Sequence, residues 1–387
     1  MKIIVAPDSF KECLTASEVA QVLASALRVR FPEAEVVEIP LADGGEGTLE
    51  VLVRALGGTI VPEKVHDPLD RWVQACYGVW DNTAILEVAQ ACGIQLVKPE
   101  ERNPFKADTR GVGELLLAAR ARGCRRFIVG LGGTVTCDGG RGMLSVPGVR
   151  ELLREAEVEL LCDVQVPLTG PTGAIRLFGP QKGASPAHVE VLEAEMLQWA
   201  AQMREETGVD VLARPGAGAA GGLGAAFMAY ARPVVYPGIQ RVLDLCHFDQ
   251  ALAGASLVIT GEGRSDRQTL QGKVPLGVLQ RVRDGASSPG GAVSGLAASG
   301  MGAVPSILEA PGGAVSGLAA SGKDAKPGQG APVVLLSGRI DDARTLQAAG
   351  FAQLIEVSPR TLPLPEALAP STARSNLRAA IQHLVLD

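Results

Sequence analysis

The feature that most constrains the fold is an alternation of short β-branched runs with longer helical patterns. Eight segments have strand character: Ile3–Ala6, Glu35–Leu41, Ala84–Val88, Phe127–Leu131, Glu159–Cys162, Leu257–Thr260, Val333–Ser337 and Gln353–Val357. Five have helical character: Ala16–Phe31, Thr48–Leu56, Gly113–Arg122, Pro186–Thr207 and Ser371–Leu386. This alternation predicts an α/β fold with mainly parallel sheets. Ligands of such sheets bind beyond the carboxyl ends of the strands.

Charge and cysteine spacing exclude several classes of protein. The net charge is −6 without a long basic run, which argues against nucleic-acid binding. The seven cysteines are scattered and form no C-x-x-C pair, so we expect reduced thiols in a cytoplasmic protein. The opening run Ile3–Ala6 is too short for a signal peptide core. No apolar run reaches the roughly 18 residues of a transmembrane helix, so no membrane association is expected.

A duplicated segment accounts for part of the high glycine content of 47 residues. The twelve residues at 289–300 recur unchanged at 311–322. Small residues dominate this region and cannot bury a core, which predicts a flexible insertion over residues 285–330. Residues 317–324 nearly match a phosphate-binding Walker A loop, but Asp324 replaces the required hydroxyl residue, and we reject the match.

Four junctions between a strand and a helix share one chemistry, because each places a carboxylate directly after a strand. They are Pro7–Lys11, Ala42–Thr48, Gly132–Gly140 and Gly261–Asp266. Carboxylates at such positions can bind a metal cation or accept a proton from a hydroxyl. A single junction of this kind is more often an ordinary turn or helix cap. The repetition favours a shared site.

A glycine-rich stretch at Gly216–Gly224 matches G-x-G-x-x-G and precedes a predicted helix. A phosphate could bind at the amino end of that helix. A dinucleotide loop would need a strand directly before the glycines and an acidic residue about 20 positions later. Arg214 and Pro215 interrupt any strand, and the next acidic residue is Asp244. Close packing of the helix is the remaining alternative.

Two lysines, Lys11 and Lys273, lie beside the acidic loops. Each could hold an anionic substrate or a phosphate as a point charge. An isolated lysine is usually a solvated surface group. Lys273 follows the acidic Gly261–Asp266 loop by a few residues, and this position favours a role in ligand binding.

Taken together, these segments resemble the type I glycerate kinase family. The resemblance is carried, in order, by Ala6–Lys11, Ala42–Thr48, Glu101–Pro104, Gly111–Glu114, Gly132–Thr134 with Asp138–Gly140, Cys162–Val164, Phe178–Ala184, Pro215–Gly224 and Ile259–Lys273. Each segment alone is weak evidence, whereas the ordered set is specific. It covers nearly the whole chain apart from the predicted insertion.

The resemblance implies Mg²⁺-dependent transfer of the γ-phosphoryl group of ATP to a hydroxyl of D-glycerate. It also implies two α/β domains with the active site in the cleft between them. The first, Rossmann-like or flavodoxin-like, would comprise residues 1–64 and 240–387. The second, residues 65–239, would be inserted within it. Phosphoryl transfer depends more on positioning and charge neutralisation than on covalent chemistry.

Under this resemblance the site residues divide by role. The catalytic candidates are Asp163, as base for the substrate hydroxyl, with Lys11 and Asp8. The candidates for binding glycerate are Ser9, Lys11, Arg102, Asp43 and Glu46. Those for the nucleotide are Gly132, Gly133, Thr134, Lys182, Gly216, Gly218 and Lys273. Those for the metal are Asp138, Glu262 and Asp266.

The chain departs from the family pattern in three places. The family sequence Gly-Gly-Ser-Ala-Thr-Asn-Asp is replaced by a bulkier one at Gly132–Asp138. Val166 stands where an asparagine is expected. A stretch of some tens of residues is shortened to Leu144–Val158, and its loss could leave an exposed sheet edge or a cavity.

Two other functions stay open at this point. The shortened region motivates a degraded, catalytically impaired relative of glycerate kinase, and the Gly216–Gly221 match motivates an NAD-dependent oxidoreductase. The sequence does not distinguish the 2-hydroxyl from the 3-hydroxyl as acceptor. It leaves open whether the chain forms a homo-oligomer.

Overall fold

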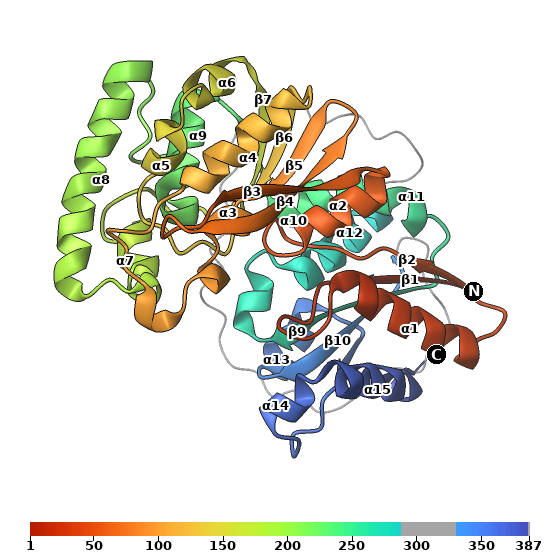
Figure 1. Cartoon of the computed structure of the whole chain (residues 1–387). Helices are drawn as coiled ribbons and strands as arrows, with labels where there is room; N and C mark the ends of the chain where they lie inside the picture. Colours follow the sequence, from red (N-terminus) through yellow and green to blue (C-terminus); the bar gives the residue numbers. More distant parts are fainter. Residues whose placement is uncertain (288–329, 386–387) are drawn as a thin grey trace.

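The computed structural model describes residues 1–287 and 330–385, in which the strands form two sheets (Figure 1). The first sheet has five strands in the order β11-β10-β9-β1-β2, and every neighbouring pair is parallel. Its strands are β1 (Lys2–Pro7), β2 (Glu35–Glu38), β9 (Leu257–Ser265), β10 (Val333–Ile340) and β11 (Gln353–Glu356). Both ends of the chain therefore contribute to this sheet.

The second sheet has six strands in the order β3 to β8 and is built from the middle of the chain. They are β3 (Thr59–His66), β4 (Trp72–Trp80), β5 (Thr83–Glu87), β6 (Arg126–Gly130), β7 (Glu157–Leu161) and β8 (Val234–Tyr236). The strands β3, β4 and β5 pair antiparallel, whereas β5 to β8 are parallel. The predicted α/β fold with mainly parallel sheets is confirmed.

Helices connect and cover the strands. The α-helices are α1 (Ala16–Arg30), α2 (Thr48–Leu56), α3 (Ala89–Cys92), α4 (Arg110–Ala121), α5 (Arg141–Ser145), α6 (Val149–Glu155), α7 (Ala174–Phe178), α8 (Pro186–Thr207), α9 (Leu223–Tyr230), α10 (Gly238–Leu245), α11 (Phe248–Leu252), α12 (Val274–Ser287), α13 (Ala343–Ala349), α14 (Leu364–Ala367) and α15 (Pro370–Ala380). The 3-10 helices are η1 (Ile94–Leu96), η2 (Pro99–Glu101), η3 (Pro180–Lys182), η4 (Ala219–Gly222), η5 (Arg267–Leu270) and η6 (Ile381–His383).

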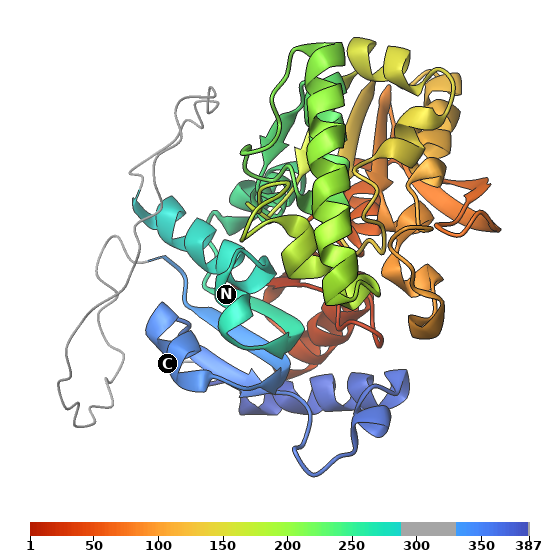
Figure 2. The same ribbon diagram turned by 90° about the vertical axis from the view of Figure 1, so that its left-hand side faces the viewer.

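The five-stranded sheet is buried on both faces. Ile3 and Val5 of β1 pack with α1 and α15, which come from opposite ends of the chain and lie side by side (Figure 1). Ile4 of β1 faces the other way, toward α10 and α12. This burial on both faces explains why β1 is a continuous apolar run. The helix α8 lies along the outside of the molecule (Figures 1 and 2).

The two sheets share one hydrophobic cluster. Ile85, Ile128 and Leu161, from β5, β6 and β7, belong to the same cluster as Ile4 of β1 and Leu52 of α2. Burial of apolar surface of this kind stabilises the contact by about 25 cal/mol per Å². The relative position of the two sheets, and of the loops at their strand ends, is therefore fixed by packing.

Several predicted boundaries differ from the structure. The helices Thr48–Leu56 and Pro186–Thr207 are confirmed to the residue. The strand pair β3 and β4 was not predicted, because charged and polar residues interrupt its alternation, as in Pro62-Glu63-Lys64. The helix predicted over Ser371–Leu386 is wrong at its end, since α15 stops at Ala380 and η6 follows.

The predicted insertion falls mainly outside the described residues. The duplicated segments at 289–300 and 311–322 and the rejected Walker-like match at 317–324 lie there entirely. At the borders of the predicted insertion, α12 extends to Ser287 and β10 begins at Val333.

The shortened region after the Asp138 loop forms a compact connection. Residues 141–155 fold into α5 and α6 and lead directly into β7. Met143, Leu144, Leu152 and Leu153 are buried in the core of the six-stranded sheet. β7 pairs with β6 on one side and β8 on the other, so the sheet is continuous at this point.

None of the helices in residues 1–287 and 330–385 is long and apolar enough to cross a membrane.

Candidate active site

The carboxyl ends of strands from both sheets meet around the loop that follows β2. Gly44 in this loop has a φ of +93°, which favours glycine, and a Cβ there would lie 3.0 Å from Cβ of Leu161 at the end of β7. A Cβ on Gly130, the last residue of β6, would lie 2.4 Å from the Gly44 carbonyl oxygen. This close contact brings Asp43 to the ends of β6 and β7.

Asp163, the predicted base, follows β7 and is held beside this loop. Its Oδ1 accepts a hydrogen bond of 2.8 Å from the backbone amide of Gly238, the first residue of α10. Burial raises the pKa of Asp163 to about 7, and the negative charge of Asp43 contributes in the same direction. A carboxylate with a pKa near neutrality is suited to accept a proton from a hydroxyl.

Asp8 is a deeply buried carboxylate of the group. It follows β1, is 5% exposed, and its backbone amide donates to the Gly261 carbonyl at 2.8 Å. Burial and then the charge of Asp43 raise the pKa of Asp8 well above its usual range. The negative charges of Asp8 and Asp43 therefore disfavour each other, and a cation or a proton would relieve this repulsion.

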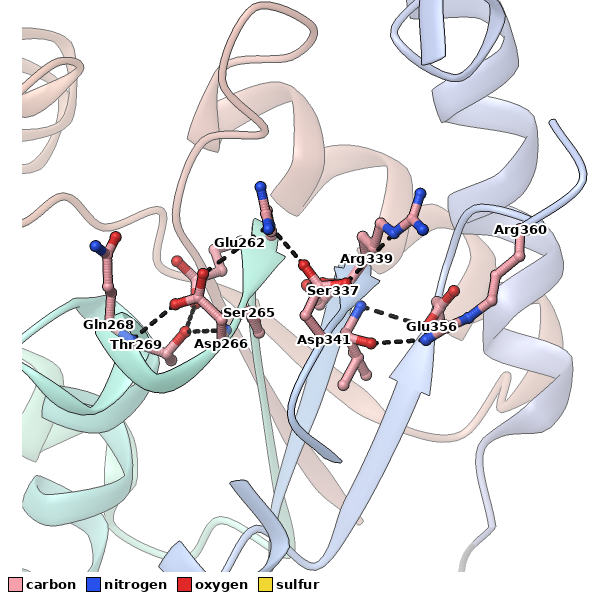
Figure 3. Close-up of polar contacts among 12 residues, drawn as sticks. Glu262, Ser265, Asp266, Gln268, Thr269, Ser337, Arg339, Asp341, Glu356 and Arg360 are labelled. Carbon is pink, nitrogen blue, oxygen red and sulfur yellow. Dashed lines mark hydrogen bonds and ion pairs between the residues drawn. The ribbon is translucent and has the colours of Figure 1, made fainter. Parts of the chain in front are cut away.

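Glu262 lies within β9, three residues before its end, and has three polar neighbours, of which Ser265 and Thr269 are drawn in Figure 3. Its Oε1 accepts hydrogen bonds of 3.0 Å from Ser265 and 2.6 Å from Thr269, and its Oε2 lies 3.6 Å from Nζ of Lys273. Burial raises the pKa of Glu262, while these partners act against the shift. Glu262 thus orients Lys273, whose side chain remains one-third exposed.

Two cavities open onto these residues. The larger, of about 580 Å³, is lined at one end by Asp8, Ser9, Lys11, Asp43 and Lys273. The smaller, of about 260 Å³, is lined by Ser9, Lys11 and Glu46. The Ser9 hydroxyl is buried and has no hydrogen-bond partner among the described residues. An unpartnered buried hydroxyl beside an exposed lysine is a suitable place for a carboxylate.

The loop Gly132–Thr134, after β6, also faces the Asp43 loop. A Cβ on Gly132 would lie 2.9 Å from Cα of Gly45. The amides of Gly132, Gly133 and Thr134 donate no hydrogen bond within the described residues, so they remain available to an anion.

Lys182 supports this loop from inside. It is 3% exposed, and its Nζ donates to the Thr134 hydroxyl at 3.2 Å and to the Thr136 carbonyl at 2.8 Å. Burial lowers its pKa. The predicted contact of Lys182 with a nucleotide phosphate does not fit this geometry, because its ammonium group is already directed at the loop.

The glycines Gly216 and Gly218 face the protein's own backbone. A Cβ on Gly218 would lie 2.4 Å from the Pro167 carbonyl oxygen, and its amide donates to Val166. A Cβ on Gly216 would lie 3.3 Å from the Val164 carbonyl oxygen, and both glycines are buried. The structure thus supports close packing, and not a nucleotide contact, for this stretch.

Two of the three predicted metal ligands organise loops. Oδ2 of Asp138 accepts hydrogen bonds from the hydroxyl and amide of Thr109 and from the amide of Gly142. Asp266 caps η5 through the amide of Gln268. Across residues 1–287 and 330–385, no three acidic, histidine or cysteine side chains form a group that could hold a metal ion. Asp138, Glu262 and Asp266 therefore do not form such a group, although Glu262 and Asp266 are neighbours through Thr269.

Arg102 lies outside both cavities. Its guanidinium donates to the Gln181 carbonyl at 3.1 Å, and its Nε is buried without a partner among the described residues.

Two residues of the site were not predicted from the sequence. The contact of Gly238 with Asp163 was not predicted, because no motif links these two residues. Ser265 was also missed, and its place two residues after Gly263 in the acidic loop was the available signal.

Known proteins resemble this chain over most of its length. The model of the glycerate kinase family matches residues 3–152 and 145–311. Glycerate 2-kinase from Escherichia coli K12 is 40% identical over 308 residues, which cover 72% of this chain and 81% of that protein. Glycerate kinase from Bacillus subtilis 168 is 41% identical over 313 residues, covering 73% of this chain and 82% of that protein.

The structural comparison gives the same family. The solved structure of a candidate glycerate kinase 2 from Salmonella typhimurium LT2 matches with a TM-score of 0.76 and 34% identity. The match covers 99% of this chain and 97% of that one. The order of loops around Asp8, Asp43, Asp163 and Glu262, together with these similarities, leads to one conclusion: the chain belongs to the glycerate kinase family.

Proposed function

We propose that this protein is a type I glycerate kinase that transfers the γ-phosphoryl group of ATP to a hydroxyl of D-glycerate. The observation that carries the proposal is the placement of Asp163, whose carboxylate accepts a hydrogen bond from the Gly238 amide where α10 meets the Asp43 loop. Burial raises the pKa of this carboxylate, which suits a base. Lys11 and the unpartnered Ser9 hydroxyl line the cavities at the same junction. Relatives named glycerate kinase support the identity of the substrate.

In this proposal each residue has a separate task. Lys11 and Ser9 bind the glycerate carboxylate, and Asp163 accepts the proton of the attacking hydroxyl. The hydroxyl oxygen bonds to the γ-phosphorus, the bond to the β–γ bridging oxygen breaks, and ADP leaves with that electron pair. The amides of Gly132, Gly133 and Thr134 and the ammonium of Lys273 stabilise the negative charge of the transferred group.

The residues present fit a magnesium ion that arrives with the nucleotide. Mg²⁺ is usually held by one or two carboxylates together with substrate phosphates and waters, so it does not need a cage of three protein ligands. Asp8 and Asp43 are the pair whose mutual repulsion a cation would relieve. When bound, the ion would neutralise phosphate charge, and Asp8 and Asp43 are the candidates to hold it.

Packing and topology support a division into two units. Strands of the five-stranded sheet come from both chain ends, and those of the six-stranded sheet lie between them. We place the first boundary before β3, because the predicted boundary after residue 64 falls inside that strand. The active site would then lie in a cleft between the units. The seven free thiols are consistent with a cytoplasmic location.

The second candidate is a catalytically impaired protein, which is suggested by the shortened region at residues 144–158. The compact α5–α6 connection, with Met143 and Leu153 fully buried, favours the active form. Tight binding of glycerate or ATP without turnover would support the impaired form, as would activity that returns when the missing stretch is restored.

The role of Lys11 can be tested by steady-state kinetics with Mg-ATP and D-glycerate. In Lys11→Met the KM for D-glycerate should rise about tenfold or more, with a smaller change in the KM for ATP, because a charge partner of the carboxylate is removed. Lys106→Met, on an exposed residue outside both cavities, is the matched control. An unchanged KM for D-glycerate in Lys11→Met would contradict this role.

A further inference from the structure

The larger cavity extends well beyond the residues assigned to glycerate. From Asp8 and Lys11 it continues past the ends of β9 and β10 to the segment after β11 and to α14 and α15. Its volume of about 580 Å³ lies within the range of pockets for ligands of drug size. A three-carbon acid would fill only one end, so the outer part is available to a larger ligand.

The outer end of the cavity is mostly apolar. Its walls are formed by Val357, Pro359, Leu362, Leu364, Ala367, Leu368 and Ala373. Leu364 is 66% exposed, although it is a large apolar residue. Apolar walls of this kind suit the faces of a planar aromatic ring.

Polar groups at this end are held in fixed positions (Figure 3). Arg360 donates to the Ile340 carbonyl at 2.7 Å and to Glu356 at 2.8 Å, which ties the segment after β11 to the end of β10. The amide of Ser358 donates to the Gly338 carbonyl at 3.1 Å. The outer wall is thus built by the sheet and is not a loose loop.

Between the two ends lies a pair of arginines on neighbouring strands. Arg264 of β9 and Arg339 of β10 are register partners, and both line the cavity. They share Asp341, at 2.6 Å from Nε of Arg264 and 3.4 Å from Nε of Arg339. Their side chains are 69% and 55% exposed, so further N–H groups remain free to face an anion. Lys11 and Lys273 line the same cavity, together with Asp8 and Asp43.

We propose that the outer end of this cavity binds the nucleoside part of ATP, with the phosphate chain passing Arg264 and Arg339 toward Lys11 and Lys273. The apolar wall receives the adenine, and the arginines neutralise the α- and β-phosphates. The γ-phosphate then reaches the junction where Asp43 and the Gly132–Thr134 loop meet. The identity of the nucleotide rests on the proposed function. The rival position at Gly216 and Gly218 is filled by the protein's own backbone.

The first test measures binding of ADP by calorimetry, without glycerate. Ala367→Trp fills the outer end and Arg339→Gln removes one cation; each should weaken ADP binding about tenfold or more, which corresponds to roughly 1.4 kcal/mol. Binding of D-glycerate, measured separately, should change less than about twofold. The matched controls are Ala369→Trp, next to the cavity but outside its lining, and Arg344→Gln on α13. Circular dichroism verifies that each variant is folded.

The second test locates the base directly by photolabelling the full chain with 8-azido-ADP. Label on a peptide within residues 357–373 supports the proposal. Label confined to residues 130–136 or 214–224 overturns it, as does ADP binding that is unchanged in both Ala367→Trp and Arg339→Gln. Because ADP binding is measured independently of turnover, a protein that binds ADP here but does not phosphorylate glycerate would contradict only the proposed function.

Discussion

The Asp163 carboxylate accepts a hydrogen bond of 2.8 Å from the backbone amide of Gly238, at the start of α10. A Cβ on Gly238 would lie 1.9 Å from the Asp43 carbonyl oxygen and 3.0 Å from the second carboxylate oxygen of Asp163. Because Gly238 has no side chain, the end of β7, the Asp43 loop and the start of α10 can pack against one another.

This contact predicts a strong effect of Gly238→Ala. The added methyl group cannot fit without moving the Asp43 loop, so we expect turnover to fall at least about 100-fold, since small displacements of catalytic groups have such effects. The thermal midpoint should fall as well. Gly285→Ala is the control, because its Cβ would meet only the end of the Leu252 side chain, at 3.3 Å. Activity of Gly238→Ala equal to that of the control would show that this contact does not position Asp163.

The pKa of Asp163 predicts the pH dependence of the reaction. A base must be ionised to accept a proton, and burial together with Asp43 raises the pKa of Asp163 to about 7. We therefore expect kcat/KM to rise with pH up to about 7 and then to level off. Measurement between about pH 5 and pH 9 tests this, and a profile that is flat across the acid range would contradict the assignment.

Glu87 predicts a pH dependence of stability. It is 4% exposed at the end of β5, accepts a 2.6 Å hydrogen bond from the amide of Leu49 in α2, and has a pKa raised by burial to about 7. A raised pKa in the folded state contributes stability below the unfolded pKa of roughly 4.3, and this stability is lost as pH rises through about 7.

The Glu87→Gln variant should therefore be more stable than the parent at pH 8, by up to roughly 3 kcal/mol, since each pKa unit is worth about 1.4 kcal/mol. Urea unfolding at pH 5 and pH 8 measures the difference. Glu157→Gln, on a side chain that is 79% exposed, is the control. A Glu87→Gln variant that loses stability equally at both pH values would show that Glu87 is ionised in the folded protein.

Much of the fold was predictable from local pattern. The run Ile3–Ala6 is apolar throughout because β1 is covered on both faces, and the capping box of Thr15 and Glu18 marks the start of α1. The hairpin β3–β4 was missed, because its partly exposed strands carry charged residues such as Glu63 and Lys64. Tertiary pairing, and not local propensity, stabilises these strands.

The placement of the carboxylates Asp8, Asp43 and Asp163 near one another was predictable, because each follows a parallel strand of its sheet. Their roles in the reaction stay predictions. The roles of the glycines were not predictable, because glycine occurs in two different settings. Gly133 lies in an exposed loop, whereas Gly218 packs against backbone atoms. Lys182 shows the same limit, since a lysine within a motif resembles an anion-binding residue until its burial is known.

The most direct test of the central claim follows labelled phosphate from [γ-³²P]ATP to D-glycerate in the parent and in Asp163→Asn. The account predicts labelled phosphoglycerate from the parent, in step with ADP and dependent on Mg²⁺. It predicts a rate about 10² to 10⁴ lower for Asp163→Asn, with ADP and D-glycerate still bound. Separation of the 2- and 3-phosphate products identifies the acceptor hydroxyl. Absence of labelled phosphoglycerate from the parent, or undiminished turnover in Asp163→Asn, would contradict it.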